Sequence, residues 1–240
     1  MKMSSFLLLA AIISCMLARK AYGVELVEPY NRCYGQVELG FIVDGSRSIE
    51  ASACGNFKRM LDFTQRIASG FGIASSQTRV GVGLYSTFAS VPIPFGKYTS
   101  LQETVEGIKK LRYPGEGTRT GRALKLMKTH LFSQSRPKAH KVLIVLTDGT
   151  SVDDVKAPAK ALRESGVEVF AVGIGEHYRP RELKDIATDT GHVLTAGFRD
   201  LMSVERKLRD AVCKSVRKAM MANAYQQGVG ACASSPCYGK

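Results

Sequence analysis

The chain has 240 residues, of which 45% are hydrophobic and 23% charged, and its formal net charge is +13 at pH 7. About 215 residues remain after an N-terminal targeting segment, which is ample for one core of ordinary domain size, so no second domain is needed. The positive charge favours polyanionic partners, with charges spread over a solubilising surface as the alternative interpretation. Beyond the N-terminal region, no segment is long and apolar enough to predict a membrane span.

Residues 1–23 are predicted to be a secretory signal peptide. Their apolar run from Phe6 to Leu17 follows a basic residue, and the small residues Ala21 and Gly23 fit a cleavage site that ends at Gly23. A membrane anchor is the weaker interpretation, because the run covers about 12 residues where a span needs roughly 20. Cleavage would remove three basic residues and leave a strongly basic chain. For a secreted protein, sulfated glycosaminoglycans, acidic matrix proteins and mineral-associated polymers are then the expected polyanions, and nucleic acid is not.

Apolar periodicity predicts strands that alternate with helices along the rest of the chain. Runs of five or six apolar residues between turn signals indicate strands that are covered on both faces. Two prolines within Val91–Phe95 confine that strand to a sheet edge. The alternation implies the α/β class, with right-handed crossovers and a doubly wound, mostly parallel sheet flanked by helices. The expected strands cover 37–44, 79–86, 91–95, 141–147, 167–172 and 192–195, and the expected helices cover 57–68, 101–111, the stretch up to about 132, 155–164, 180–187 and 198–218.

The first strand ends in an Asp-x-Ser-x-Ser turn. Asp44, Ser46 and Ser48 place one carboxylate and two hydroxyls at the mouth of a buried strand, and Mg²⁺ and Ca²⁺ prefer oxygen ligands. Alone the motif is weak, because Ser and Asp also favour plain turns. A second buried-type strand ends in Asp148, and a glycine-rich segment contains Thr118. Ligands gather outside the carboxyl ends of strands in open α/β sheets, so both carboxylates are expected at one edge.

Together these segments resemble a von Willebrand factor type A domain, the fold shared with integrin inserted domains and matrilins, over roughly residues 37–213. The family's metal-ion-dependent adhesion site combines an Asp-x-Ser-x-Ser loop, a Thr from a later loop and an Asp that ends a central strand. Thr118 is matched in preference to Thr120, because the family's ligand is the first Thr of a Thr-x-Thr-Gly element. Other family-like stretches occur at 78–87, 166–175 and 182–193. The positions that match the site are Asp44, Ser46, Ser48, Thr118 and Asp148.

The resemblance implies adhesion that depends on a divalent metal. The protein would supply only part of the coordination shell, so that a partner's carboxylate could replace a water molecule. Mg²⁺ suits this arrangement because it demands octahedral geometry and retains waters, while Ca²⁺ and Mn²⁺ stay open as alternatives. Arg47 and Arg119 lie within the ligand loops and are expected at the rim, where they would favour an acidic partner. Solvated loop charge is the alternative interpretation of these two residues.

Five cysteines remain after removal of the predicted signal peptide, and an odd number leaves one thiol unpaired. Several extracellular relatives carry a bridge that joins the domain's termini, which implies a Cys33–Cys213 pair. Cys232 and Cys237 would then close a local loop near the C-terminus. That leaves Cys54, either as a buried thiol or as a disulfide link to a second chain in an oligomer.

The predicted function is that of a secreted binding module of the extracellular matrix that binds an acidic side chain of a partner such as a collagen. The expected organisation is a signal peptide over 1–23, a lead-in over 24–36, the domain over 37–213 and a cysteine-bearing tail over 214–240. A structural component of fibrous, collagenous or mineralised matrix, acting through its basic surface and disulfides, is the alternative.

An enzyme is not expected. The four histidines are scattered without metal-ligand spacing, no nucleophile-elbow motif is present, and the Gly-x-Gly pairs lack the further glycine of a dinucleotide site. In residues 199–218, seven basic residues accompany three acidic ones. Binding of a heparin-like polyanion there is a hypothesis, with a solvated helical face as the alternative.

Overall fold

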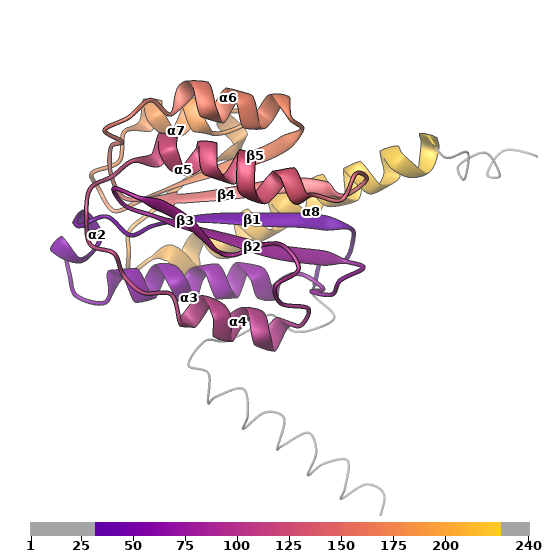
Figure 1. Cartoon of the computed structure of the whole chain (residues 1–240), viewed down its shortest axis with the longest axis horizontal. Helices are drawn as coiled ribbons and strands as arrows, with labels where there is room; N and C mark the ends of the chain where they lie inside the picture. Colours follow the sequence, from indigo (N-terminus) through magenta and orange to yellow (C-terminus); the bar gives the residue numbers. More distant parts are fainter. Residues whose placement is uncertain (1–31, 227–240) are drawn as a thin grey trace, which may run out of the picture.

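A computed structural model describes residues 32–226. The predicted signal peptide, most of the lead-in, Cys232 and Cys237 lie outside these residues. Within them, six strands form one sheet in the order β3-β2-β1-β4-β5-β6, and helices cover both of its faces (Figure 1). The predicted fold class, a doubly wound and mostly parallel sheet with one antiparallel edge strand, is confirmed.

The strand order places β1 in the middle of the sheet. β1 pairs in parallel with β2 on one side and with β4 on the other, and Asp44 lies opposite Tyr85 in this register. Because β1 and β4 are parallel neighbours, the residues that follow them meet at the same edge of the sheet. β3 is antiparallel to β2 and forms one edge, as its prolines predicted. The strands are β1 (Val37–Asp44), β2 (Thr78–Tyr85), β3 (Ala89–Ile93), β4 (His140–Thr147), β5 (Val167–Ile174) and β6 (Val193–Ala196).

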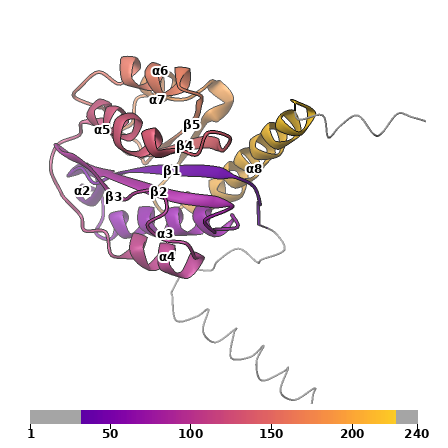
Figure 2. The ribbon, with the colours of Figure 1, turned by 45° about the vertical axis from the view of Figure 1, so that its right-hand side comes forward.

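The helices divide between the two faces of the sheet. α3, α4 and α8 cover one face, and α5, α6 and α7 cover the other (Figures 1 and 2). Pro158 is tolerated in α6 because it lies in the first turn, where a backbone N–H has no partner within the helix. The helices are α2 (Ser48–Ala51), α3 (Asn56–Ser69), α4 (Leu101–Lys109), α5 (Thr120–Leu126), the π-helical η2 (Met127–Leu131), the 3-10 turns η3 (Phe132–Gln134) and η4 (Thr190–His192), α6 (Lys156–Glu164), α7 (Pro180–Ile186) and α8 (Leu201–Gln226).

Alternate residues of β1 supply the two halves of the core. Leu39 and Phe41 point toward the layer of α3 and α8, whereas Ile42 belongs to the layer of α5 and α6. All three side chains are fully buried, and each such burial contributes roughly 1.5–3 kcal/mol. Gly40 also faces the second layer, where a Cβ would come within 2.9 Å of the Phe132 ring. The missing side chain therefore lets η3 pack closely on the sheet.

Three local features differ from the sequence-based expectation. The short helix α2 was not predicted, and the helix expected to run to Phe132 changes from α5 into a π-helical turn and then a 3-10 turn. The last helix was expected to end at Lys218 but continues to Gln226, so its final turns extend beyond the sheet (Figures 1 and 2). Its continuation through Ala219–Ala222 reflects the high helix propensity of Ala and Met. No helix in the described part of the chain combines the length and apolar character that crossing a membrane requires.

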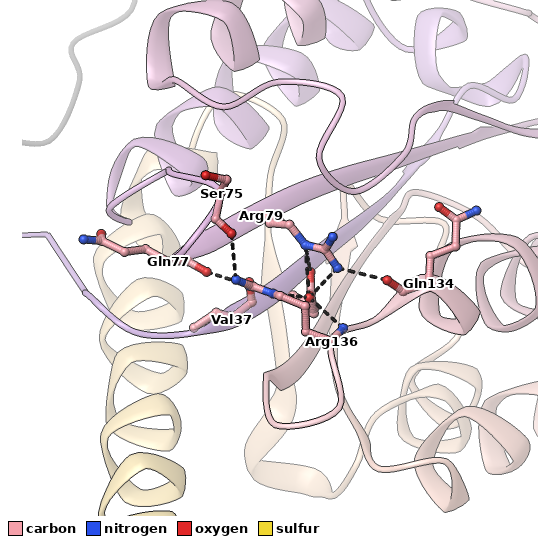
Figure 3. Close-up of polar contacts among 7 residues, drawn as sticks. Val37, Ser75, Gln77, Arg79, Gln134 and Arg136 are labelled. Carbon is pink, nitrogen blue, oxygen red and sulfur yellow. Dashed lines mark hydrogen bonds and ion pairs between the residues drawn. The ribbon is translucent and has the colours of Figure 1, made fainter.

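A fully buried carboxylate, Glu38, anchors the amino end of β1. Figure 3 shows Arg79 and Arg136, the two arginines that bind it. Arg79 donates to it from Nε at 2.9 Å and from Nη2 at 2.6 Å, and Arg136 donates from Nε at 2.7 Å. The guanidinium of Arg136 also donates to three backbone carbonyls, those of Val37, Ser75 and Gln77. This cluster ties β1 and β2 to the loop that leads into β4.

Candidate metal centre

Asp44, at the carboxyl end of β1, is fully buried. Its Oδ1 accepts a hydrogen bond from the backbone N–H of Ser46 at 2.8 Å. Its Oδ2 accepts from the Tyr85 hydroxyl and from the Thr147 hydroxyl, each at 2.9 Å. The two strands that flank β1 therefore orient this carboxylate through neutral donors.

The remaining predicted ligands of the first loop connect to Asp148. The hydroxyls of Ser46 and Ser48 lie 3.0 Å apart, and Ser48 donates to Asp148 Oδ1 at 2.7 Å. Asp148 follows β4 and is 2% exposed. The structure thus joins Asp44, Ser46, Ser48 and Asp148 in one hydrogen-bonded chain across the edge of the sheet.

Backbone contacts hold the loop after β1 in place. Gly45 donates to the Tyr85 carbonyl at 2.8 Å, and a side chain at Gly45 would clash with Pro114. Arg47 donates to the Glu116 carbonyl at 2.7 Å, so the glycine-rich segment lies directly beside this loop. The Tyr113 hydroxyl donates to the Ser46 carbonyl at 2.8 Å. The loop is therefore fixed from two sides.

Thr118 lies on that neighbouring segment and is half-buried. Its carbonyl accepts from the Val152 N–H at 2.9 Å, which links the segment to the loop after Asp148. Among the described residues, no hydrogen bond joins the Thr118 hydroxyl to the chain of predicted ligands. Thr120 is instead fully buried, with its hydroxyl 3.0 Å from that of Tyr85. The structure therefore brings four of the predicted positions together and places Thr118 on the adjacent loop.

Tyr85, Thr120 and Thr147 support Asp44 from behind and were not predicted from the sequence. Tyr85 and Thr147 lie at the carboxyl ends of the strands that flank β1, and that position is the signal from which they could have been found. Arg47 and Arg119, the predicted rim residues, are both exposed. Neither arginine forms an ion pair within the described residues.

Electrostatics distinguish this cluster from the other buried acids. Glu38 and Glu205 are each paired with two arginines, Glu38 with Arg79 and Arg136, and Glu205 with Arg66 and Arg209. Within residues 32–226, Asp44 and Asp148 form no ion pair with a Lys, Arg or His side chain. These two carboxylates therefore lie together without an ion-paired cation among the described residues, although the charge of His177 lowers the pKa of Asp148 in part.

The pKa values of Asp44 and Asp148 are both consistent with the absence of an ion-paired cation. Burial raises the pKa of Asp44 above its ordinary value, and hydrogen bonds from Ser46, Thr147 and Tyr85 offset this only in part. Burial and the nearby charge of Asp44 raise the pKa of Asp148 to about 6. Burial, reinforced by the charge of Asp44, also raises the pKa of Tyr85, which keeps its hydroxyl a neutral donor. A bound cation would favour the ionised form of both carboxylates.

The donor set fits a hard divalent cation. Two carboxylates and two hydroxyls are all oxygen donors, which Mg²⁺, Ca²⁺ and Mn²⁺ accept. Within the described residues, no three His, Cys, Asp or Glu side chains are grouped so as to hold a metal. A site that uses two carboxylates with hydroxyls is consistent with that finding.

Comparison with known proteins decides the family. The family model of the von Willebrand factor type A domain matches residues 38–207. The chain belongs to this family. Its fold, with the strand order and single antiparallel edge described above, agrees with that assignment.

Relatives of the domain are proteins of the extracellular matrix. Mouse vitrin is 37% identical over 142 residues, which are 59% of this chain and 21% of vitrin. The mouse collagen alpha-4(VI) chain is 32% identical over 75% of this chain and 8% of its own length, and chicken matrilin-1 is 32% identical over 74% and 36%. The chain thus spans about a third or less of these relatives' lengths. Their location confirms the prediction of a secreted, extracellular matrix protein.

Solved structures include a relative with metal in the corresponding motif. Proximal thread matrix protein 1 from the mussel byssus, described with a zinc-occupied MIDAS motif, superposes with a TM-score of 0.73 at 27% identity. The match covers 76% of this chain and 49% of that one. The BatB protein from Bacteroides thetaiotaomicron has a TM-score of 0.61 at 15% identity and shows the fold alone.

The structure also describes three of the cysteines. Cys33 and Cys213 are buried thiols joined by a hydrogen bond, which lowers the pKa of Cys33 and raises that of Cys213. A disulfide between them therefore stays a prediction. Cys54 is exposed, so the interpretation of a buried thiol is wrong. It follows α2 in a turn that ends at Gly55, whose φ of 84° directs the chain into α3, and this turn keeps Cys54 outside the core.

Proposed function

We propose that the chain binds an acidic group of an extracellular matrix partner through a divalent metal. The observation that carries the proposal is the pair of buried carboxylates, Asp44 and Asp148, which share an edge of the sheet with two serine hydroxyls and form no ion pair among the described residues. The family match and the mussel relative with zinc in its motif support it. The proposed ligands are Asp44, Ser46, Ser48, Thr118 and Asp148.

Each ligand contributes in a way that follows from its surroundings. Asp44 and Asp148 would supply negative charge, and the serines would supply neutral oxygens that leave a bound ion electrophilic. Thr118 would contribute its hydroxyl from the loop that Val152 holds in place. When bound, the ion supplies a Lewis-acidic position for an incoming carboxylate. Mg²⁺ is the proposed ion because it readily keeps part of its shell as exchangeable water.

The rim residues suit an acidic partner. Arg47 and Arg119 are exposed on the two loops that meet through the Arg47–Glu116 backbone contact. Cationic side chains near the site would steer an acidic segment toward it and raise the association rate. The proposed partner is an extracellular matrix protein, such as a collagen, that presents an acidic side chain.

Isothermal calorimetry tests the metal site. The chain without its predicted signal peptide is titrated with Mg²⁺, Mn²⁺, Ca²⁺ and Zn²⁺, beside Asp44→Ala and the control Asp210→Ala, which removes an exposed carboxylate on α8. Saturable one-to-one binding is expected in the wild type and the control and absent in Asp44→Ala. Absence of binding in the wild type, or equal binding in Asp44→Ala, would overturn the proposal.

A second candidate is a structural role through the basic surface. A cavity of about 430 Å³ on α8 is lined by Arg209, Lys214, Arg217 and Lys218, and Asp210 is the acidic residue there. This surface favours a sulfated glycosaminoglycan bound without metal. Retention on heparin-agarose in the presence of chelator tests it. Elution below physiological salt would exclude this role.

A further inference from the structure

A groove of about 610 Å³ runs between α5 and α6, on the face of the sheet opposite α3 and α8. Figures 1 and 2 show these two helices side by side above the sheet. One wall carries cationic side chains from α5 and η2, namely Arg122, Lys125 and Lys128. The other wall is built from small apolar residues of α6, namely Ala157, Pro158 and Ala161.

The groove begins beside the candidate metal centre. Gly121 lines it and directly follows Thr120, while Asp153 lines it from the loop that follows Asp148. The two segments are joined there, because Thr120 N–H donates to Ser151 Oγ at 3.1 Å and Gly121 N–H donates to Asp153 Oδ1 at 2.8 Å. A polypeptide that reaches the metal centre could therefore continue into the groove.

The acidic residues at this end are already used by the fold. Asp153 accepts from the N–H groups of Gly121 and Arg122 and from Ser151 Oγ, so it caps the start of α5. Asp154 accepts from the N–H groups at the start of α6. Both carboxylates thus lie at helix N-termini, where the helix dipole favours negative charge. Backbone N–H groups therefore already donate to both carboxylates, and within the described residues neither forms an ion pair with the cations along the groove.

The cations of the groove have no acidic partner in the described part of the chain. Lys125 is exposed and Lys128 half-buried, and neither forms an ion pair there. Arg122 lies over the ring of Phe88, 5.6 Å from its centroid, and Phe88 is 68% exposed. The groove therefore combines the unpaired positive charge of Lys125 and Lys128 with the apolar wall of α6.

The backbone is irregular where the cationic wall ends. Met127–Leu131 forms a π-helical turn, and Lys128 lies within it. Such a turn widens the helix and is frequently found at functional sites. The Thr129 hydroxyl donates to the carbonyl of Lys125 at 3.0 Å, which links the π-helical turn to the preceding turn of α5. A side chain within the π-helical turn, Thr129, thus helps to hold this irregular backbone in place.

We infer that the α5–α6 groove binds an acidic polypeptide segment with small apolar side chains. This inference deepens the proposed function and rests on it in one respect, namely that the same partner is taken to place a carboxylate at the metal centre. Acidic side chains of the segment would pair with Lys125 and Lys128, and its apolar side chains would pack on Ala157 and Ala161. The apolar wall favours a polypeptide over a sulfated polysaccharide, whose surface is polar throughout.

Fluorescence anisotropy tests the groove with a labelled peptide of repeating Glu-Ala-Ala units. Binding is measured in EDTA, so that the metal contact is absent, for wild type and for Lys125→Glu/Lys128→Glu. The matched control is Lys109→Glu/Lys110→Glu, which makes the same change of charge at exposed positions at the end of α4, on the opposite face. We expect the first pair to weaken binding at least about tenfold and the control to change it less than about twofold.

A groove-filling variant, Ala161→Trp, separates the groove from charge alone. It should also weaken peptide binding about tenfold, while binding of labelled heparin stays unchanged. Equal losses in both lysine pairs, or no loss in Ala161→Trp, would overturn the inference. Heparin binding that depends on Lys125 and Lys128 more strongly than peptide binding does would also overturn it, in favour of a polysaccharide.

The same assay in Mg²⁺ distinguishes this inference from the proposed function. Tighter peptide binding in Mg²⁺ for wild type, but not for Asp44→Ala, would support the metal contact. Absence of that gain, together with loss of binding in Lys125→Glu/Lys128→Glu, would contradict the metal-dependent function and leave the groove supported. Circular dichroism of each variant confirms that the fold is retained.

Discussion

The two ends of β1 carry buried acids in opposite electrostatic settings. Glu38, at the amino end, receives four charge-assisted hydrogen bonds from the side chains of Arg79 and Arg136. Asp44, at the carboxyl end, receives only neutral donors from Ser46, Tyr85 and Thr147. Both residues are fully buried in the same strand. The first end contains its own counter-ions, whereas the second has an unbalanced charge that an external cation would neutralise.

A third acid, Glu168, lies between these extremes. It is the second residue of β5, and its carboxylate lies 2.8 Å from His140 and from His192 and also accepts from Ser215. Arginine stays charged at all accessible pH values, but histidine is charged only below its pKa. Glu38 is therefore paired with permanent cations and Glu168 with histidines whose charge depends on pH. Asp44 is paired with no cation among the described residues. This difference in ion pairing distinguishes acids that stabilise the fold from acids of a binding site.

The largest expected effect comes from removing Glu38. Glu38→Ala would leave two half-buried guanidinium groups without their carboxylate and should lower the free energy of unfolding by about 3–5 kcal/mol. Urea denaturation followed by circular dichroism measures it. Glu164→Ala, at an exposed pair with Lys160, is the control and should cost less than about 1 kcal/mol. A similar small loss in Glu38→Ala would remove the distinction between the two ends of β1.

An intermediate effect is expected from Glu168, whose partners include two histidines that carry a charge only when they are protonated. Burial raises the pKa of Glu168, but hydrogen bonds from His140, Ser215 and His192 outweigh it and bring the pKa to about 2. Since this value lies below the unfolded value of 4.5, the ionised acid contributes stability above pH 4.5 that is lost as the pH falls toward 2. The loss should be about 2 kcal/mol after allowance for partial exposure.

His192 gives the stability of the fold the opposite dependence on pH. Burial lowers the pKa of His192, yet hydrogen bonds to Asp189 and Glu168 outweigh it and raise the pKa above 6.5. Its contribution is therefore complete below pH 6.5 and is lost as the pH rises through the folded value. Thermal melts between pH 2 and 9 measure both limbs. Glu168→Gln should flatten both limbs, and an unchanged profile would contradict this assignment.

The smallest effect is expected at the carboxyl end of β1. Asp44→Asn removes an unbalanced buried charge, so in EDTA at pH 7 it should raise the free energy of unfolding by about 1 kcal/mol. In Mg²⁺ the order should reverse, because only the wild type would gain stability from the ion. Urea denaturation with and without Mg²⁺ measures both. A loss of stability in EDTA comparable with that of Glu38→Ala would mean that Asp44 is a structural acid.

The sequence predicted the sheet well because its strands are continuous apolar runs, and it located Asp44 and Asp148 because both end such runs. It could not predict the partners of Glu38, since Arg79 and Arg136 lie 41 and 98 residues away and carry no local signal. The support from Tyr85 and the burial of Thr120 likewise depend on how β2 and α5 pack against β1. The π-helical turn and the extension of α8 were missed because helical periodicity does not mark either change.

The parallel pairing of β1 with β4 has a consequence for the order of events in folding. Ser48 and Asp148, which touch in the finished protein, are 100 residues apart in the chain. Between them the chain must form two further strands and cross the sheet, so this long-range closure costs considerable loop entropy. The oxygen donors therefore do not exist as a set in the unfolded chain. An ion held by that set would act as a ligand of the native state alone, and the midpoint of thermal unfolding would rise with its concentration.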